Sequence, residues 1–114
     1  VSETSVADLN SRLETPVTYR NFRPNIVCKI DTAFTEDSWN KIKIGDLKFD
    51  VAKQCSRCIL TTIDPETGIK RSDKEPVETL NGYRRSPAGI MFGVNLIPRS
   101  LGSLRIGDTI SVIE

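Results

Sequence analysis

Two short runs of alternating apolar and polar residues, joined by a glycine and an aspartate, constrain the fold of this 114-residue chain most strongly. Residues 41–44 and 47–51 have the two-residue period of a half-buried strand, and Gly45-Asp46 between them is typical of a tight hairpin turn. Further strands are predicted from β-branched or apolar runs at residues 25–30, 58–63, 104–106 and 109–113. We therefore expect a mainly β fold of the α+β class, with a barrel-like or sandwich sheet and a few short flanking helices.

Two short helices are predicted outside these strands. Apolar residues recur at helical spacing from Val6 to Leu13, which indicates a helix over about residues 5–14. Pro76 is typical of the first turn of a helix, so a second helix is expected there. No linker divides the chain, and we expect residues 1–114 to form one domain of a longer protein.

The composition excludes several classes of function. Sixteen basic residues against fifteen acidic ones leave a net charge of +1 with the signs mixed, so no face for nucleic acid is predicted. No apolar run reaches the roughly 20 residues of a membrane-spanning helix, and no signal peptide is visible. The chain contains no histidine, which removes the commonest general base and metal ligand. Three cysteines are too few for a disulfide scaffold, so we expect a reducing, cytoplasmic location, with an organelle left open.

Residues 55–58, with the sequence Cys-Ser-Arg-Cys, are the strongest candidate for chemistry. Zinc usually takes four ligands, and this pair with the distant Cys28 falls short of that number. A redox dithiol needs a helix to lower the pKa of its thiol, whereas residues 59–63 favour a strand. Two interpretations stay open on this pattern alone. The cysteines are small buried hydrophobes, or one thiolate binds a soft metal while Arg57 lowers the thiol pKa and holds an anionic cofactor.

Besides residues 55–58, further short motifs are distributed over nearly the whole chain. In order, they are residues 2–10, Phe22-Arg23-Pro24-Asn25-Ile26-Val27, Phe34-Thr35-Glu36-Asp37-Ser38-Trp39, Ile44-Gly45-Asp46, Cys55-Ser56-Arg57-Cys58, Asp64-Pro65-Glu66-Thr67-Gly68, Glu75-Pro76, Phe92-Gly93-Val94-Asn95 and Gly107-Asp108. Their order strongly resembles MOSC domains. Within that superfamily it is similar to the mitochondrial amidoxime-reducing components and their bacterial relatives of the YcbX type, and less similar to the C-terminal domain of molybdenum cofactor sulfurase.

This resemblance implies a molybdenum cofactor, Mo-molybdopterin, held by a MOSC-type, β-barrel-like domain. In the family pattern the second cysteine of the Cys-x-Arg-Cys motif ligates molybdenum. The resemblance therefore implies that Cys58 is the metal ligand and the catalytic residue, and that Cys55 is structural. It also implies that six further residues contact the cofactor, namely Thr4, Ser5, Arg23, Asn25, Ser56 and Arg57.

The chemistry of these residues agrees with such roles without requiring them. A helix N-terminus presents unpaired N–H groups, so the region of Thr4 and Ser5 could bind the phosphate of the cofactor. Arg23 and Arg57 could add bidentate positive charge. Equally, Ser5 could be a simple helix cap, with Asp8 completing an arrangement like a capping box, and Arg23 could be an exposed turn residue.

The resemblance further implies reduction of an N-hydroxylated small molecule. Because three cysteines cannot supply a typical iron–sulfur cluster, the electrons must come from a separate donor protein or domain of iron–sulfur or cytochrome type. The amidoxime-reducing relatives also carry a preceding β-barrel region that contacts the cofactor, so such an N-terminal region is an expected partner. Two alternatives remain. The domain could carry sulfur as a persulfide on Cys55 or Cys58, or it could be a noncatalytic module that handles the cofactor.

Overall fold

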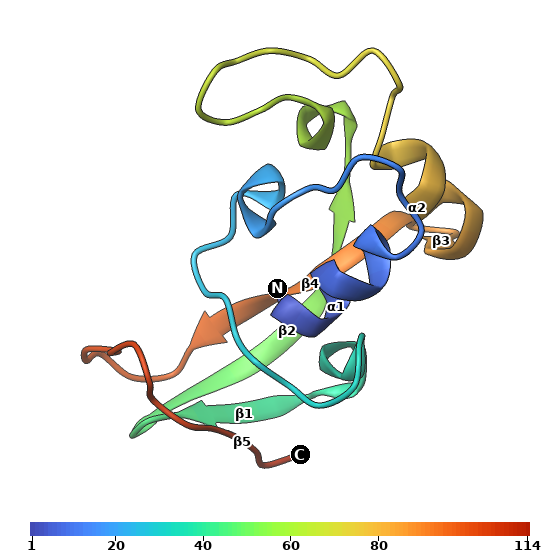
Figure 1. Cartoon of the computed structure of the whole chain (residues 1–114). Coiled ribbons are helices and arrows are strands. Elements are labelled where there is room, and N and C mark those ends of the chain that lie inside the picture. Colours follow the sequence, from blue (N-terminus) through green and yellow to red (C-terminus); the bar gives the residue numbers. More distant parts are fainter.

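A computed structural model describes residues 1–114 as an open antiparallel sheet flanked by short helices (Figure 1). The strand order is β3-β4-β2-β1-β5. The expected α+β, mainly β class is confirmed, and the sheet does not close into a barrel within this chain. The strands are β1 (Lys41–Ile44), β2 (Leu47–Arg57), β3 (Arg85–Ser86), β4 (Gly89–Pro98) and β5 (Ile110–Val112), and the helices are α1 (Glu3–Asn10), α2 (Val77–Tyr83) and the 3-10 helices η1 (Tyr19–Phe22), η2 (Thr35–Ser38) and η3 (Ile59–Thr62).

The predicted hairpin is confirmed at β1 and β2. Ile44 lies opposite Leu47, and Gly45 between them has a φ of 57°, a conformation that glycine adopts without a steric penalty. Ile42 and Ile44 are buried on one face of β1, whereas Lys41 on the other face is exposed. This alternation places the apolar side of the hairpin against the interior.

The β2–β4 pair is the longest in the sheet and carries the Cys-Ser-Arg-Cys segment at one end. Sequence periodicity ends β2 at residue 51, but the strand continues to Arg57. Its register with β4 shifts between Gln54 and Ser56, so Cys55 lies at a β-bulge. Cys55 and Arg57 are half-buried while Ser56 between them is exposed, and the cysteine and the arginine therefore share the inner face.

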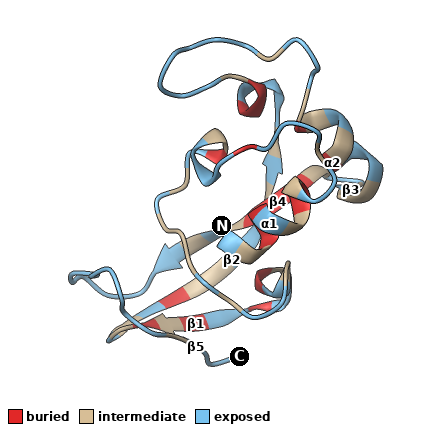
Figure 2. Ribbon diagram, viewed as in Figure 1, coloured by how far each residue is buried: buried red, intermediate tan, exposed pale blue.

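Two hydrophobic clusters hold these elements together (Figure 2). The first joins α1 and α2 to β4, and in it Phe22 stacks on Phe92 with ring centroids 4.1 Å apart. The second covers one face of β1 and β2 around Trp39 and Phe49. Neither α-helix has the length and apolar character needed to cross a membrane.

Several predicted elements differ from the structure at their ends. The helix expected over residues 5–14 is α1, which begins earlier because the Ser2 hydroxyl accepts a 3.0 Å hydrogen bond from the N–H of Ser5. The alternative in which Ser5 caps the helix together with Asp8 is therefore wrong, since Ser2 is the cap. The second helix is confirmed as α2, which follows Pro76.

Three predicted strands are wrong. Residues 25–30 are extended but form only an isolated parallel bridge between Ser2 and Cys28, because the partner segment enters α1 at once. Residues 58–63 form η3 instead of a strand. Residues 104–106 form no strand, whereas the strand predicted at 109–113 is confirmed as β5, which pairs with β1.

Candidate functional site

A cavity of about 470 Å³ lies between the sheet and the segment that follows η1, and we call it the sheet cavity. Its volume is within the range of roughly 300–1,000 Å³ that is usual for ligand pockets. Apolar side chains form most of its wall, and they come from β1, β2 and β4 as well as from Val1 and the segment after η1. Its polar lining includes Arg23, Asn25, Glu36, Cys55, Arg57 and Asn95. Three predicted cofactor-binding residues, Arg23, Asn25 and Arg57, are thus brought together.

Arg57 is fixed in this wall by main-chain carbonyl groups. Its Nε donates to the carbonyl oxygen of Phe92 at 2.7 Å, and its Nη1 donates to that of Phe22 at 2.9 Å. Burial lowers the pKa of Arg57, and the nearby thiols of Cys55 and Cys58 oppose that shift. No carboxylate pairs with the guanidinium, and its Nη2 makes no hydrogen bond within the chain. The side chain is therefore held firmly while one edge stays free for an anionic or polar ligand.

The two cysteines of the segment lie in different environments. Cys55 is half-buried at the bulge and lines the sheet cavity. Cys58 is exposed, does not line that cavity, and occupies the N-cap position of η3 directly after β2. Its Sγ makes no hydrogen bond. No group of three His, Cys, Asp or Glu side chains is close enough to hold a metal ion.

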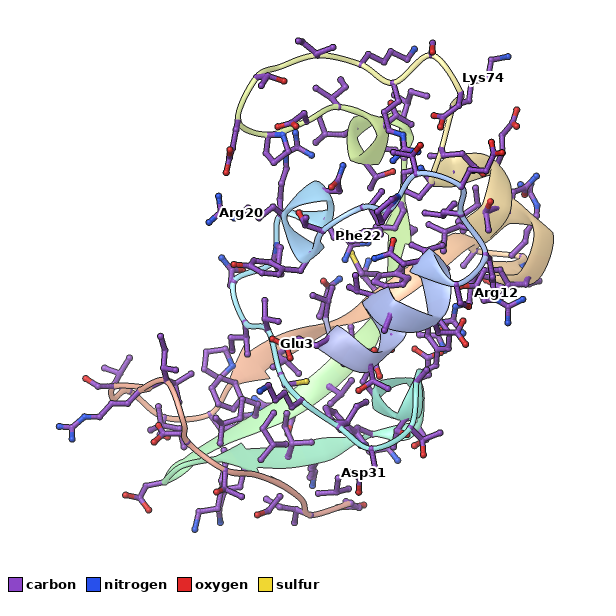
Figure 3. The ribbon with its side chains drawn as sticks, in the orientation of Figure 1. Glu3, Arg12, Arg20, Phe22, Asp31 and Lys74 are labelled. Carbon is purple, nitrogen blue, oxygen red and sulfur yellow. The ribbon has the colours of Figure 1, made fainter.

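Arg23 fixes the helix that begins after Cys58. Its Nη1 donates to the carbonyl oxygens of Asn21 at 3.1 Å and Leu60 at 3.0 Å, and its Nη2 donates to that of Ile63 at 3.3 Å. These bonds tie η1 to η3. Figure 3 shows the labelled Phe22, the last residue of η1, directed into the molecule, whereas Arg20 of the same helix points outward. Arg23 thus positions the main chain around the Cys58 thiol.

Of the other four predicted site residues, only Asn25 lines the sheet cavity. Asn25 is exposed at its rim, and Ser56 is exposed on β2 opposite Met91 of β4. Thr4 and Ser5 lie on α1 and bond within the chain, with the Thr4 hydroxyl donating to the carbonyl oxygen of Ile30. Ser5 is fully buried. Its hydroxyl accepts from the Phe34 N–H at 2.8 Å and donates to Glu36 Oε1 at 2.8 Å, so it reaches the cavity only through Glu36.

Glu36 and Trp39 are lining residues to which sequence reasoning gave no role. They are 1% and 7% exposed, and Glu36 Oε2 and Trp39 Nε1 have no hydrogen-bond partner within the chain. Buried polar atoms are normally paired, so these two mark the part of the cavity where a hydrogen-bonding group is missing. Trp39 is the only tryptophan of the chain, but the polar run before it gave no periodic signal that would place Glu36 inside.

Comparison with known proteins gives consistent similarities. The family model of the MOSC domain matches residues 1–111. The chain is 44% identical to mitochondrial amidoxime-reducing component 1 of Homo sapiens over 99% of its own length and 36% of the human protein. It is 42% identical to mitochondrial amidoxime reducing component 2 of Rattus norvegicus, over 96% of this chain and 35% of the rat protein. The chain therefore spans about a third of the length of these relatives. Because they are mitochondrial proteins by name, the expected cytoplasmic location is wrong.

Proposed function

The chain belongs to the MOSC domain family, and from this premise we propose that it forms part of the molybdenum-cofactor site of an oxidoreductase that reduces N-hydroxylated compounds. The observation that carries the proposal is the arrangement at the end of β2. An exposed thiol without a hydrogen-bond partner, that of Cys58, directly follows an arginine that carbonyl groups hold in place. The relatives named for amidoxime reduction support the class of substrate.

The residues present fit such a cofactor. A single accessible thiolate is a suitable ligand for a metal whose remaining ligands come from the cofactor itself, and Cys58 is the most exposed of the three cysteines. The free edge of Arg57 and the exposed side chain of Asn25 at the cavity rim can donate hydrogen bonds to a pterin or its phosphate. Ser56 is exposed on the other face of β2, so a contact from its hydroxyl would reach the cofactor from outside the sheet cavity. When bound, the cofactor would supply the two-electron redox chemistry.

Each remaining residue of the site would act through position. Arg23 would hold η1 and η3 so that Cys58 stays at the surface. Thr4 and Ser5 would act by fixing α1 to the segments at Ile30 and Glu36, since their hydroxyls already bond there. Cys55, half-buried at the bulge, would keep the structural role that the resemblance implies.

The parent protein would supply what this chain lacks. We propose a separate electron donor of iron–sulfur or cytochrome type, because three cysteines cannot form a typical four-thiolate cluster. We also propose that an N-terminal region of the same parent completes the cofactor site, in agreement with relatives of which this chain spans about a third. The chain itself would be one MOSC domain.

The test compares two cysteine variants of the full-length parent, produced in a host that makes the molybdenum cofactor. We expect near-stoichiometric molybdenum in the parent and in Cys55→Ser, and loss of molybdenum in Cys58→Ser, measured by elemental analysis. The parent should reduce an amidoxime with a chemical electron donor, and Cys58→Ser should not. Equal molybdenum in both variants would contradict the ligand assignment. A persulfide on either cysteine without any reduction would contradict the reductase and favour sulfur transfer.

A further inference from the structure

The first three residues form a short parallel ladder with the segment after η1. Val1 N donates to the carbonyl oxygen of Ile26 at 3.1 Å, Cys28 N donates to that of Val1 at 3.0 Å, and Glu3 N donates to that of Cys28 at 2.8 Å. This is the alternating pattern of parallel strands, in which one strand bonds through every second residue. Figure 3 shows Glu3 at the start of α1, beside that segment.

The ladder has one further step available in the direction that precedes Val1. The N–H of Ile26 and the carbonyl oxygen of Pro24 make no hydrogen bond within the chain. In the register set by the three existing bonds, the N–H of Ile26 points to the position of the carbonyl two residues before Val1. That same residue would donate its own N–H to Pro24. Proline has no N–H, so the ladder would end there.

The sheet cavity lies beside this open step. Val1 lines the cavity, and side chains two residues apart on a strand point to the same face. The residue two positions before Val1 would therefore direct its side chain into the same space. The wall of this cavity is mainly apolar, with Ile42, Ile44 and Phe49 among its residues, and it also contains Glu36 and Trp39, whose Oε2 and Nε1 are unpaired.

We propose that the apolar part of the sheet cavity is the docking site of an extended segment that leads directly into Val1 in the longer protein, and that this segment adds a parallel strand to residues 24–26. Its alternate residues are apolar and fill that part of the cavity, its polar groups pair with Glu36 and Trp39, and the rim at Asn25 and the free edge of Arg57 stay open to the cofactor. Strand addition of this kind takes its hydrogen bonds from the main chain and its specificity from pockets for alternate side chains. The direction and register of the ladder favour this occupant over a free small molecule, because both are already set by Val1–Glu3.

The experiment measures amide hydrogen exchange by NMR in the 114-residue chain and in the full-length protein without cofactor. We expect the Ile26 amide to exchange on the order of a hundredfold more slowly in the full-length protein, because it gains an acceptor. The Cys28 amide, bonded to Val1 in both forms, should be protected in both. The Lys29 amide, which has no acceptor, should be unprotected in both and is the matched control.

A second comparison uses the full-length protein alone, so it does not depend on whether the 114-residue chain folds. Within the full-length protein alone, Ile26 should exchange far more slowly than Lys29. If Ile26 exchanges as fast as Lys29 there, the proposal is wrong, whatever fills the cavity. Because no molybdenum is present, the outcome is independent of the proposed reductase function.

Discussion

The hydroxyl of Ser5 donates a 2.8 Å hydrogen bond to Oε1 of Glu36, and both side chains are buried. No Lys or Arg pairs with Glu36, and its Oε2 is unpaired. The Ser5 hydroxyl is therefore the side-chain donor to a carboxyl group on the wall of the sheet cavity. A buried polar group that loses its partner costs much more than the net strength of one hydrogen bond.

Replacing Ser5 with alanine should consequently destabilise the fold. We expect Ser5→Ala to lower the free energy of unfolding by about 1–3 kcal/mol, measured by urea denaturation at neutral pH. Ser38→Ala is the matched control, because its exposed hydroxyl donates to the Thr35 carbonyl at 2.8 Å, and its effect should stay within about 0.5 kcal/mol. Equal effects of the two substitutions would contradict a structural role for the Ser5–Glu36 bond.

Arg57 should not tolerate replacement by lysine, although the charge is kept. Lysine lacks the planar fork with which Arg57 reaches the carbonyl oxygens of Phe92 and Phe22 at the same time. We expect Arg57→Lys to lower the free energy of unfolding by about 1.5–3 kcal/mol. In Arg85→Lys, the control, an exposed contact with Asn81 is lost and stability should change by less than about 0.5 kcal/mol. Molybdenum content of the full-length variant should fall as well.

Two glycines should respond oppositely to alanine. Gly93 has a φ of 82°, and a Cβ there would lie 2.9 Å from Val1 Cγ1 and 3.1 Å from Arg57 Nη2. Gly93→Ala should therefore destabilise the chain by about 1–3 kcal/mol. Gly82 lies inside α2 with open space around it, and Gly82→Ala should stabilise by about 0.5–1 kcal/mol. Thermal unfolding of both variants would check the signs, and a stabilising Gly93→Ala would contradict the close packing of Arg57.

The hairpin at Gly45 was predictable because its signals are local. Alternation fixes which face of β1 is buried, and the turn residues fix the loop. The segment after Cys58 was not predictable in this way. Its β-branched residues favour a strand, but the hydroxyls of Thr61 and Thr62 donate back to the carbonyl oxygens of Cys58 and Ile59, and Arg23 takes up two more carbonyls. The hydrogen bonds from Arg23, which is distant in the sequence, therefore stabilise η3 over a strand.

The candidate site was predictable only in part for a similar reason. Motif order identified Arg23, Asn25 and Arg57, and the structure brings these three to one cavity. Glu36 and Trp39 are buried because η2 packs against the sheet. The sequence around them has no periodic pattern from which this burial could be predicted.

Tyr83 makes the stability depend on alkaline pH. Burial raises the pKa of Tyr83 to about 12, and the nearby Asp8 carboxylate acts in the same direction. The unfolded chain, with a tyrosine pKa near 10, loses this proton first, so stability is fully present below pH 10 and falls as the pH rises toward 12. Tyr83→Phe should remove that part of the decline, as measured by denaturation across this window, whereas Tyr19→Phe should keep it. Identical pH profiles for wild type and Tyr83→Phe would contradict the assignment.

The three thiols should react with an alkylating reagent in an order set by their exposure. Cys58 is exposed, Cys55 and Cys28 are half-buried, and burial also raises the pKa of Cys28. We expect iodoacetamide to modify Cys58 first, as judged by mass spectrometry of peptides. Cys58→Ser should abolish the fast phase and Cys55→Ser should retain it. In the molybdenum-loaded full-length protein the Cys58 thiol should be protected, because a sulfur bound to a metal is no longer a free nucleophile. Fast modification of Cys58 in that protein would show that its thiol is not bound to the metal, and would contradict its role as the ligand.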